Sequence, residues 1–309
     1  MRILVLGSAA GGGFPQWNCR CANCRRAWAG DPATPRRTQS SLAVTADGVG
    51  WLLLNASPDI RQQIIDNPPL HPRGESRESP LLAVALTNAD VDHVAGLLSL
   101  RERQPITVYA TQRVHEALAA NPIFRVLDPS VVARRTLNLG ATEAIMAVDG
   151  APMGLTIEAF RIPGKTALYL ENPQASAGFG TVDGDTVGFE VRSPSRGARF
   201  LYLPGCAAID ERLTSRLTGA ELVFFDGTLW RDNEMIEAGL GTKTGARMGH
   251  LSMAGDDGSL AQLARLGVRR GIYVHINNSN PVIVADSLER RTVEQMGFEV
   301  AHDGQEIVL

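Results

Sequence analysis

Two short stretches of the chain contain the residue types that bind metal ions in proteins. The first, Thr87-Asn-Ala-Asp90-Val-Asp92-His93, follows an apolar run and presents two carboxylates and one imidazole. A short loop between a strand and a helix can bring such side chains together around one cation. An aspartate cap for the following helix is the competing interpretation, but one carboxylate is enough for a cap. The stretch therefore predicts a metal site that includes Asp90, Asp92 and His93.

The second stretch is Cys19-Arg-Cys21-Ala-Asn-Cys24, which holds three of the four cysteines. A loop with this spacing can fold three thiolates around one tetrahedral ion, and zinc is the usual occupant of such sites. Unliganded loop cysteines or a redox pair are the alternatives. We expect a structural zinc site, with Trp17 and Trp28 as its apolar surroundings. A fourth ligand has to come from elsewhere, because Cys206 lies far away in the sequence.

The elements that have to position these residues are mixed along the chain. Strand-like runs follow one another early, and helical spacing appears only between some of them, which favours two packed sheets flanked by helices over one parallel sheet. No segment has the composition of a domain linker, so we expect one α+β domain over residues 1–309. The expected strands are 2–6, 41–45, 50–54, 81–86, 106–109, 155–160, 186–191, 199–203, 221–225 and 271–274, and the expected helices are 93–103, 111–120, 209–217, 259–266 and 286–296.

Two glycine-rich segments have a more limited interpretation. The run from Gly7 to Gly13 follows the first expected strand, but it fits neither the dinucleotide-binding register nor a P-loop, so it predicts a tight turn. Residues 171–185 are rich in glycine and polar residues and predict a mobile lid. His71, His115 and His302 stand apart from the metal-binding stretches, and we expect them to be solvated.

Composition narrows the class of protein further. The net charge is −3, with 30 basic and 33 acidic residues, which argues against a broad surface for nucleic acid or anionic membrane. No secretory signal is visible, and no apolar run is long enough to span a bilayer. We therefore expect a cytoplasmic protein that does not insert into membranes and does not depend on disulfides.

The first stretch resembles the metallo-β-lactamase signature T-H-x-H-x-D-H-x-x-G-L, except that Asn88 and Asp90 replace its two leading histidines. The residues that match are Thr87, Asp92, His93, Gly96 and Leu97. Within that superfamily the chain resembles the pyrroloquinoline quinone (PQQ) biosynthesis protein B family over nearly its whole length. The further motifs of this resemblance are Gly13-Phe-Pro-Gln-Trp-Asn-Cys-Arg-Cys-x-x-Cys24, Thr-Gln-Ser-Ser41, Asn-Ala-Ser-Pro-Asp59, Gly-His-Leu-Ser252 and His-Ile-Asn-Asn-Ser-Asn-Pro281. The resemblance implies a four-layer αββα sandwich with a metal cleft at one edge of its two sheets.

Departures from the superfamily pattern change the expected metal site. Lys165 stands where hydrolytic relatives have a histidine ligand, and Cys206 stands where they have a bridging aspartate. A protonated lysine is a poor ligand, so the usual two-zinc hydrolase site is not expected. By its place in the motif order, His275 joins Asp90, Asp92 and His93. Two imidazoles with carboxylate favour a single iron(II), and zinc is the rival occupant because it binds the same atoms.

Further roles follow from the resemblance and from residue chemistry. His250 lies in a motif similar to the extra histidine motif of the ribonuclease Z and phosphodiesterase branch, and Asp226 falls where that branch has an acidic motif. An Asp226–His250 hydrogen bond would make His250 a candidate general base or acid, against the alternative of an ordinary polar loop residue. Lys165 is a candidate for binding a substrate carboxylate, as are Arg37 and Arg61, although surface salt bridges are an equal alternative for the arginines. The candidates for the fourth zinc ligand are Asn278, Asn280 and water.

The resemblance implies an enzyme of PQQ biosynthesis. The expected reaction is an iron(II)- and dioxygen-dependent hydroxylation of the tyrosine ring in a cross-linked glutamate-tyrosine unit derived from a precursor peptide. Other PQQ biosynthesis proteins are possible partners. One alternative is a carrier that assists transport of PQQ or its precursor to the periplasm, and another is a single-metal hydrolase that acts on the precursor peptide.

Overall fold

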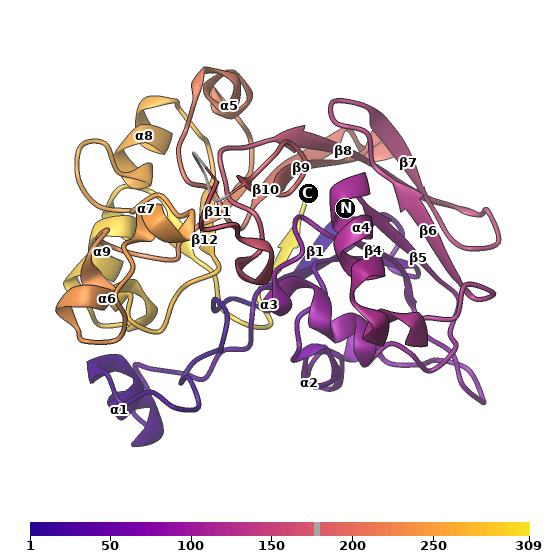
Figure 1. Ribbon diagram of the computed structural model, residues 1–309, viewed down its shortest axis with the longest axis horizontal. Coiled ribbons are helices and arrows are strands. Elements are labelled where there is room, and N and C mark those ends of the chain that lie inside the picture. Colours follow the sequence, from indigo (N-terminus) through magenta and orange to yellow (C-terminus); the bar gives the residue numbers. More distant parts are fainter. Residues whose placement is uncertain (176–179) are drawn as a thin grey trace.

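The computed structural model describes residues 1–175 and 180–309, and its two sheets pack face to face (Figure 1). The first sheet has the order β14-β1-β2-β3-β4-β5-β6, and the second has the order β13-β12-β11-β10-β9-β8-β7. The strands of the first sheet are β1 (Arg2–Gly7), β2 (Ser41–Thr45), β3 (Trp51–Leu54), β4 (Leu81–Ala85), β5 (Ile106–Ala110), β6 (Val132–Thr136) and β14 (Glu306–Val308). Those of the second are β7 (Thr142–Met146), β8 (Pro152–Arg161), β9 (Val187–Ser193), β10 (Ala198–Leu203), β11 (Val223–Asp226), β12 (Gly271–Val274) and β13 (Glu299–Val300).

Helices cover the outer face of each sheet, so that the molecule has four layers. In Figure 1, α2 and α4 lie beside the first sheet, and α5, α8 and α9 gather beside the second. The helices are α1 (Ala22–Trp28), α2 (Ile60–Asp66), α3 (Val91–Val94), α4 (Gln112–Ala120), α5 (Glu211–Leu217), α6 (Glu234–Glu237), α7 (Gly245–Met248), α8 (Ser259–Arg265) and α9 (Leu288–Gln295), with short 3-10 turns at η1 (Pro68–Leu70), η2 (Ala95–Leu98), η3 (Pro122–Val126), η4 (Leu168–Leu170), η6 (Pro194–Arg196) and η7 (Pro281–Ile283). The expected α+β, αββα architecture is confirmed.

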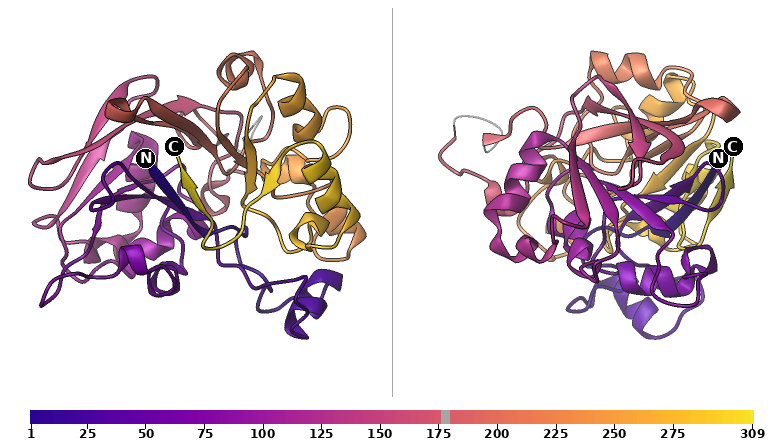
Figure 2. Two further views of the ribbon diagram at one scale, coloured as in Figure 1. Left: turned by 180° about the vertical axis from the view of Figure 1, so that it is seen from behind. Right: turned by 90° about the vertical axis from the view of Figure 1, so that its right-hand side faces the viewer.

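The apolar core explains why the sequences of many strands are continuous apolar runs. Val5, Leu54 and Phe189 are buried between the two sheets, whereas Leu4 and Leu53 are buried under the helices of the first sheet. A strand that is covered on both faces needs apolar side chains at successive positions. The two chain ends meet at the pair β1 and β14, where the Met1 amino group donates to the Leu309 carbonyl oxygen (Figure 2).

Some elements differ from the expectations. The helix expected at 93–103 is broken into α3 and η2, because Gly96 packs against the backbone of residues 56–57 so closely that a Cβ would lie 2.1 Å from the Ser57 carbonyl oxygen. Strands β6 and β7 were not predicted, since they carry polar residues and lie at sheet edges. Within the described part of the chain no helix is long and apolar enough to cross a membrane. Of the predicted lid at 171–185, residues 176–179 lie outside the described residues.

The topology brings the ends of four strands, β1, β4, β11 and β12, to one edge of the molecule. β11 and β12 are parallel neighbours, so Asp226 at the end of β11 lies beside the segment that follows β12. That segment also pairs with the chain after β1, where Ile276 N donates to the Ser8 carbonyl oxygen and Ala10 N donates to that of Ile276. The loop after β4 meets them from the first sheet. The edge between the sheets therefore collects the polar residues that the sequence singled out.

Candidate metal centres

Asp92, His93 and His275 form one cluster at this edge. Their ligand-capable atoms all lie within 4.8 Å of one another. The Asp92 Oδ2 atom is 3.1 Å from His275 Nε2 and 3.7 Å from His93 Nε2. The two imidazole rings meet edge to face, with centroids 5.3 Å apart. Two histidines and one carboxylate that converge in this way have the composition of a site for one transition-metal ion.

The hydrogen bonds of His93 test whether a metal ion fits this cluster. His93 Nδ1 is 2.8 Å from Asn88 Oδ1, which accepts its proton and leaves the lone pair on Nε2. This Nε2 atom is buried and has no hydrogen-bond partner among the residues that the structure describes. Buried polar atoms rarely stay unpaired, and a metal ion held with Asp92 and His275 would satisfy this one. The residues therefore fit the metal that the motif predicts.

Thr228 orients His275 from the side opposite Asp92. Its hydroxyl oxygen lies 2.8 Å from His275 Nδ1, so a proton on Nδ1 leaves Nε2 free to act as a ligand. The same hydroxyl donates to Asp226 Oδ1 over 2.6 Å. His275 has a φ of 57°, in the left-handed region that few residues other than glycine adopt. The surrounding bonds hold this conformation and turn the imidazole toward Asp92.

His250 and Asp226 form a buried hydrogen-bonded pair next to the cluster. The distance from His250 Nδ1 to Asp226 Oδ2 is 2.7 Å, and the His250 ring stacks on that of His275 at 5.4 Å. Cys206 N also donates to Asp226 Oδ2. Asp226 thus receives the Nδ1 proton of His250, which leaves Nε2 as the basic nitrogen. The group of Asp226, His250 and His275 is therefore better described as a hydrogen-bond network around Thr228 than as a second metal site.

The charges of the cluster are coupled through Asp92. Burial alone would raise the pKa of Asp92, but the His93 and His275 imidazoles outweigh it and hold that pKa well below its usual range. Burial lowers the pKa of His93, which favours the neutral ring that a metal needs. For His275 burial acts in the same direction, but the hydrogen bond to Asp92 outweighs it and raises the pKa. The pKa of Asp226 is lowered, because the interaction with His250 exceeds the opposing effect of burial.

The Asp226→Asn substitution is expected to change the protonation of His250 while the cluster of Asp92, His93 and His275 stays in place. Both Asp226 oxygens accept hydrogen bonds, whereas an amide has only one acceptor oxygen. With that oxygen on Thr228, the amide nitrogen faces His250 Nδ1 and cannot accept its proton, so the proton moves to Nε2 and the base is lost. We expect turnover to fall about 10²–10³-fold at unchanged metal content, with loss of the acidic limb of the pH–rate profile, which is the limb that a general base produces. Asp210→Asn is the control, because Asp210 caps α5 and asparagine caps equally well. An unchanged pH profile in Asp226→Asn would contradict this role.

The structure does not bring every predicted site residue into the cluster. Asp90 lies in extended backbone before α3, and its Oδ1 accepts from Leu168 N, so it does not share the close grouping of Asp92, His93 and His275. Arg37 is 5% exposed and donates to the Ala301 and Ile283 carbonyl oxygens, so the expectation that it meets a substrate was wrong. Arg61 is exposed on α2. His115, expected to be solvated, is instead buried, with Nε2 3.0 Å from the Arg135 carbonyl oxygen.

Lys165 lies at the border of the site in a cluster of charged groups. Its Nζ atom is 3.1 Å from Glu171 Oε1, and Arg247 holds the same carboxylate with both terminal nitrogens. The Arg247 hydrogen bonds, together with Lys165 and against the effect of burial, lower the pKa of Glu171 to about 2. Glu171 is therefore ionised throughout the physiological range.

This lowered pKa predicts how the contribution of Glu171 to stability depends on pH. Because the folded-state pKa is depressed, the contribution is complete above the unfolded value near 4.5 and is lost as the pH falls toward 2. Glu171→Gln should therefore be less stable than the wild type at pH 6, and the difference should shrink at pH 3. Urea unfolding at the two pH values measures both differences. A difference that stays constant would show that the ion pairs do not stabilise the fold.

Cys19, Cys21 and Cys24 converge at the start of α1, within 4.8 Å of one another. Hydrogen bonding from the Cys24 thiol lowers the pKa of Cys21 to about 5 and raises that of Cys24, so the cluster readily holds a thiolate. The Asn278 amide lies against the sulfurs, with Nδ2 3.0 Å from Cys19 Sγ and 3.4 Å from Cys24 Sγ. Because the two ends of an amide are nearly isosteric, a half-turn would direct Oδ1 toward a cation held by the three sulfurs.

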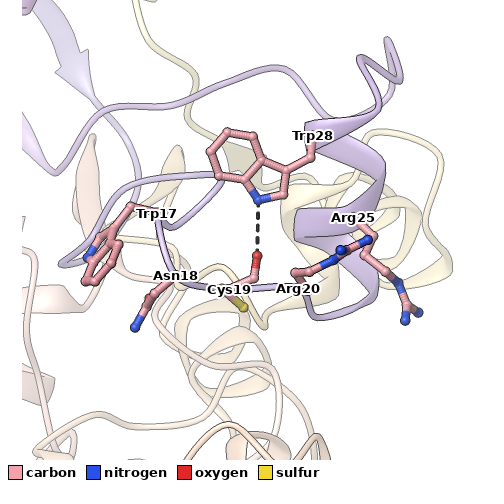
Figure 3. A pocket seen from close by; sticks show the side chains of 6 residues that line it. All are labelled: Trp17, Asn18, Cys19, Arg20, Arg25 and Trp28. Atoms are coloured by element: carbon pink, nitrogen blue, oxygen red, sulfur yellow. Dashed lines mark hydrogen bonds between the residues drawn. The ribbon is translucent and has the colours of Figure 1, made fainter.

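The other predicted neighbours of the cysteines lie elsewhere. Asn280 donates to the Gly227 carbonyl oxygen and caps η7, so it is engaged away from the sulfurs. Trp17 is 82% exposed, and the expectation that it forms apolar surroundings was wrong. Trp28 is half exposed, and its Nε1 donates to the Cys19 carbonyl oxygen (Figure 3). A short polar loop has too few apolar neighbours to bury two indole rings. The Trp28 ring therefore hydrogen-bonds to the loop, and the Trp17 ring faces solvent.

Three residues with positioning contacts were missed or left without a role by sequence reasoning. Asn88 had been noted only as a replaced ligand, yet it orients His93. Thr228 has no role in the sequence analysis, yet it joins Asp226, His250 and His275. The spacing of Thr228, two residues after Asp226, is a signal for an aspartate that binds its own loop. No pattern in the sequence indicated a role for Glu171, because its partner Arg247 lies 76 residues away.

Comparison with known proteins gives matches over most or all of the chain. A family model described as the beta-lactamase superfamily domain matches residues 50–276. The coenzyme PQQ synthesis protein B of Gluconacetobacter diazotrophicus is 52% identical over 305 residues, which cover 99% of this chain and 98% of that protein. The crystal structure of Zn²⁺-bound PqqB from Methylobacterium extorquens has a TM-score of 0.93 at 51% identity and covers 100% of both chains. A diphosphatase of the PhnP family shares the fold, with a TM-score of 0.66 at 20% identity over 99% of this chain and 97% of that one.

Proposed function

Because the chain belongs to the coenzyme PQQ synthesis protein B family of the metallo-β-lactamase superfamily, we propose that it is an iron(II)- and dioxygen-dependent hydroxylase of PQQ biosynthesis. Its substrate would be the cross-linked glutamate-tyrosine unit of the precursor, and the site of hydroxylation would be the tyrosine ring. The observation that carries this proposal is the cluster of Asp92, His93 and His275, in which the buried His93 Nε2 atom has no hydrogen-bond partner within the described part of the chain.

The ligand set supports iron(II) in this role. Two histidines and one carboxylate leave coordination positions open, as in non-haem iron oxygenases. When bound by Asp92, His93 and His275, iron(II) would supply the activation of dioxygen. Zinc is the rival occupant of this cluster, and the similar PqqB from Methylobacterium extorquens is Zn²⁺-bound. For Cys19, Cys21 and Cys24 we propose zinc, because thiolates select it.

The residues around the cluster would orient ligands and move a proton. Asn88 and Thr228 hold the tautomers that direct His93 Nε2 and His275 Nε2 inward. The Asp226 hydrogen bond places the proton of the neutral His250 ring on Nδ1, so Nε2 would take the proton that leaves the ring carbon during hydroxylation. In the balanced reaction, one oxygen atom of dioxygen enters the new C–OH bond and the other leaves as water. A small-molecule reductant supplies two electrons, and two protons complete the water.

Anaerobic reconstitution followed by addition of oxygen tests this function. Protein loaded with iron(II), given a dihydroxyphenylalanine-type or cross-linked substrate and ascorbate, should consume oxygen and yield a hydroxylated product, whereas zinc-loaded protein should not. Tight binding of PQQ without turnover, unaffected by Asp92→Ala, would contradict the hydroxylase and favour the carrier. Cleavage of the precursor peptide under nitrogen would instead support the hydrolase.

A further inference from the structure

The carboxylate of Glu171 lies between two cations of the same chain. Arg247 Nη2 is 2.8 Å from Oε2 and Arg247 Nη1 is 3.2 Å from Oε1, so the arginine holds the carboxylate with two parallel bonds. Lys165 Nζ approaches Oε1 at 3.1 Å from another direction. Two positively charged side chains therefore converge on one carboxylate among the described residues. Such a pair of cations is the arrangement with which proteins bind carboxylates.

The three charged residues lie between the loop that leads into His250 and the loop before α3. Lys165 packs its stem against Gly249, the residue before His250, where an added Cβ would be 2.9 Å from Lys165 Cγ. Arg247 belongs to α7, which leads directly into His250. On the other side, the segment between Lys165 and Glu171 contacts the loop before α3, where Tyr169 Oη donates to the Ala89 carbonyl oxygen. In Figure 1 this segment passes close to α3. Both cations thus lie beside the residues that lead into His250.

Exposure distinguishes the cations from the carboxylate. The side chain of Glu171 is 7% exposed, whereas those of Arg247 and Lys165 are 30% and 18% exposed. Part of each cationic side chain is therefore accessible to solvent, whereas Glu171 is covered. The pair of Arg270 and Glu299 provides a contrast, because it is also bidentate but has one cation, one carboxylate and similar exposure on both sides.

We propose that Lys165 and Arg247 form an anion subsite for a carboxylate of the substrate, and that Glu171 occupies this subsite until the substrate displaces it. The inference rests on the proposed function for its substrate class, an aromatic polycarboxylate. An incoming carboxylate would exchange one set of charge-assisted hydrogen bonds for another, so the cations stay paired while Glu171 turns to solvent. Glu171 would then act as an internal competitor that weakens binding of ligands that lack a carboxylate in the matching position.

Binding of PQQ to iron-free protein tests this subsite without any turnover. Glu171→Gln removes the competing charge with little change of shape, so PQQ, a tricarboxylate, should bind about tenfold more tightly in calorimetric titration. The trimethyl ester of PQQ, which keeps the rings but carries no carboxylate charge, should show no such gain. Glu299→Gln, which breaks the other bidentate pair, should bind both probes like the wild type. Glu171→Asp has a shorter side chain whose carboxylate cannot contact both cations, so it should give a smaller gain in PQQ affinity. It replaces Glu171→Gln in the titrations if that variant does not fold.

A double-mutant cycle separates recognition from a structural role. Arg247→Met should weaken PQQ binding about tenfold or more, and adding Glu171→Gln to it should restore little. Weaker or unchanged PQQ binding in Glu171→Gln would overturn the proposal and leave the charged group with a purely structural role. Because these titrations use neither iron nor oxygen, failure of the hydroxylase activity would not alter their outcome. Equal gains for PQQ and its ester would likewise overturn carboxylate recognition.

Discussion

His93→Ala is expected to remove iron from the cluster and to abolish hydroxylation. Among the described residues of the cluster, His93 Nε2 is buried without a hydrogen-bond partner, so its loss leaves Asp92 and His275 as the remaining two ligands. Loss of an outer hydrogen-bond partner typically weakens metal binding about 10–100-fold, and loss of a ligand should exceed that range. We therefore expect turnover to fall at least about 100-fold, with iron content near zero by elemental analysis of anaerobically loaded protein.

Two variants serve as controls for His93→Ala. Asn88→Ala keeps the imidazole but removes the acceptor that fixes its tautomer, so iron should bind more weakly and turnover should fall less. His115→Ala removes another buried histidine, which contacts the Arg135 carbonyl oxygen away from the cluster, and should leave iron content unchanged. Full iron content and full turnover in His93→Ala would refute the assignment of the cluster. The cysteine-bound zinc should remain in all three variants.

Cys24→Ser is expected to lose the cysteine-bound zinc and to destabilise the part of the chain that surrounds it. Cys24 is fully buried and its thiol also contacts the Asn278 amide. In small domains that fold only with the metal, zinc binding contributes about 10 kcal/mol or more to the free energy of folding. Here it would order one loop on a molecule that has its own core, so we expect a loss of a few kcal/mol. Elemental analysis and thermal unfolding measure the two effects.

The cysteine site should also influence the candidate active site. Asn23 Nδ2 donates to the carbonyl oxygens of Asn278 and Ser279, so α1 holds the segment that follows His275. Cys24→Ser should therefore weaken iron binding by a modest factor in addition to the loss of zinc. Cys206→Ser is the matched control, because the Cys206 thiol contacts the Ala208 carbonyl oxygen and stands outside the cysteine cluster. Retention of zinc in Cys24→Ser, or its loss in Cys206→Ser, would contradict the assignment.

The sequence predicted the parts of the fold and site that depend on local pattern. Apolar runs predicted β4, β11 and β12, and strand ends at a common edge bring Asp92 and His275 together. The direction of Asp90 was not predictable, because it depends on the Leu168 backbone in a segment 78 residues away. Arg37 was placed wrongly for a similar reason, since its charge is satisfied by carbonyl oxygens of distant turns. Spacing shows which residue types are close in the chain, but long-range contacts decide where their side chains point.

Labelled dioxygen tests the central claim most directly. Iron(II)-loaded protein, substrate and reductant are mixed under ¹⁸O₂, and the product is examined by mass spectrometry. The proposed hydroxylase predicts one ¹⁸O atom in the new ring hydroxyl of the product and none in the product of the His93→Ala protein. Oxygen derived only from water, or no new hydroxyl while PQQ still binds tightly, would contradict it.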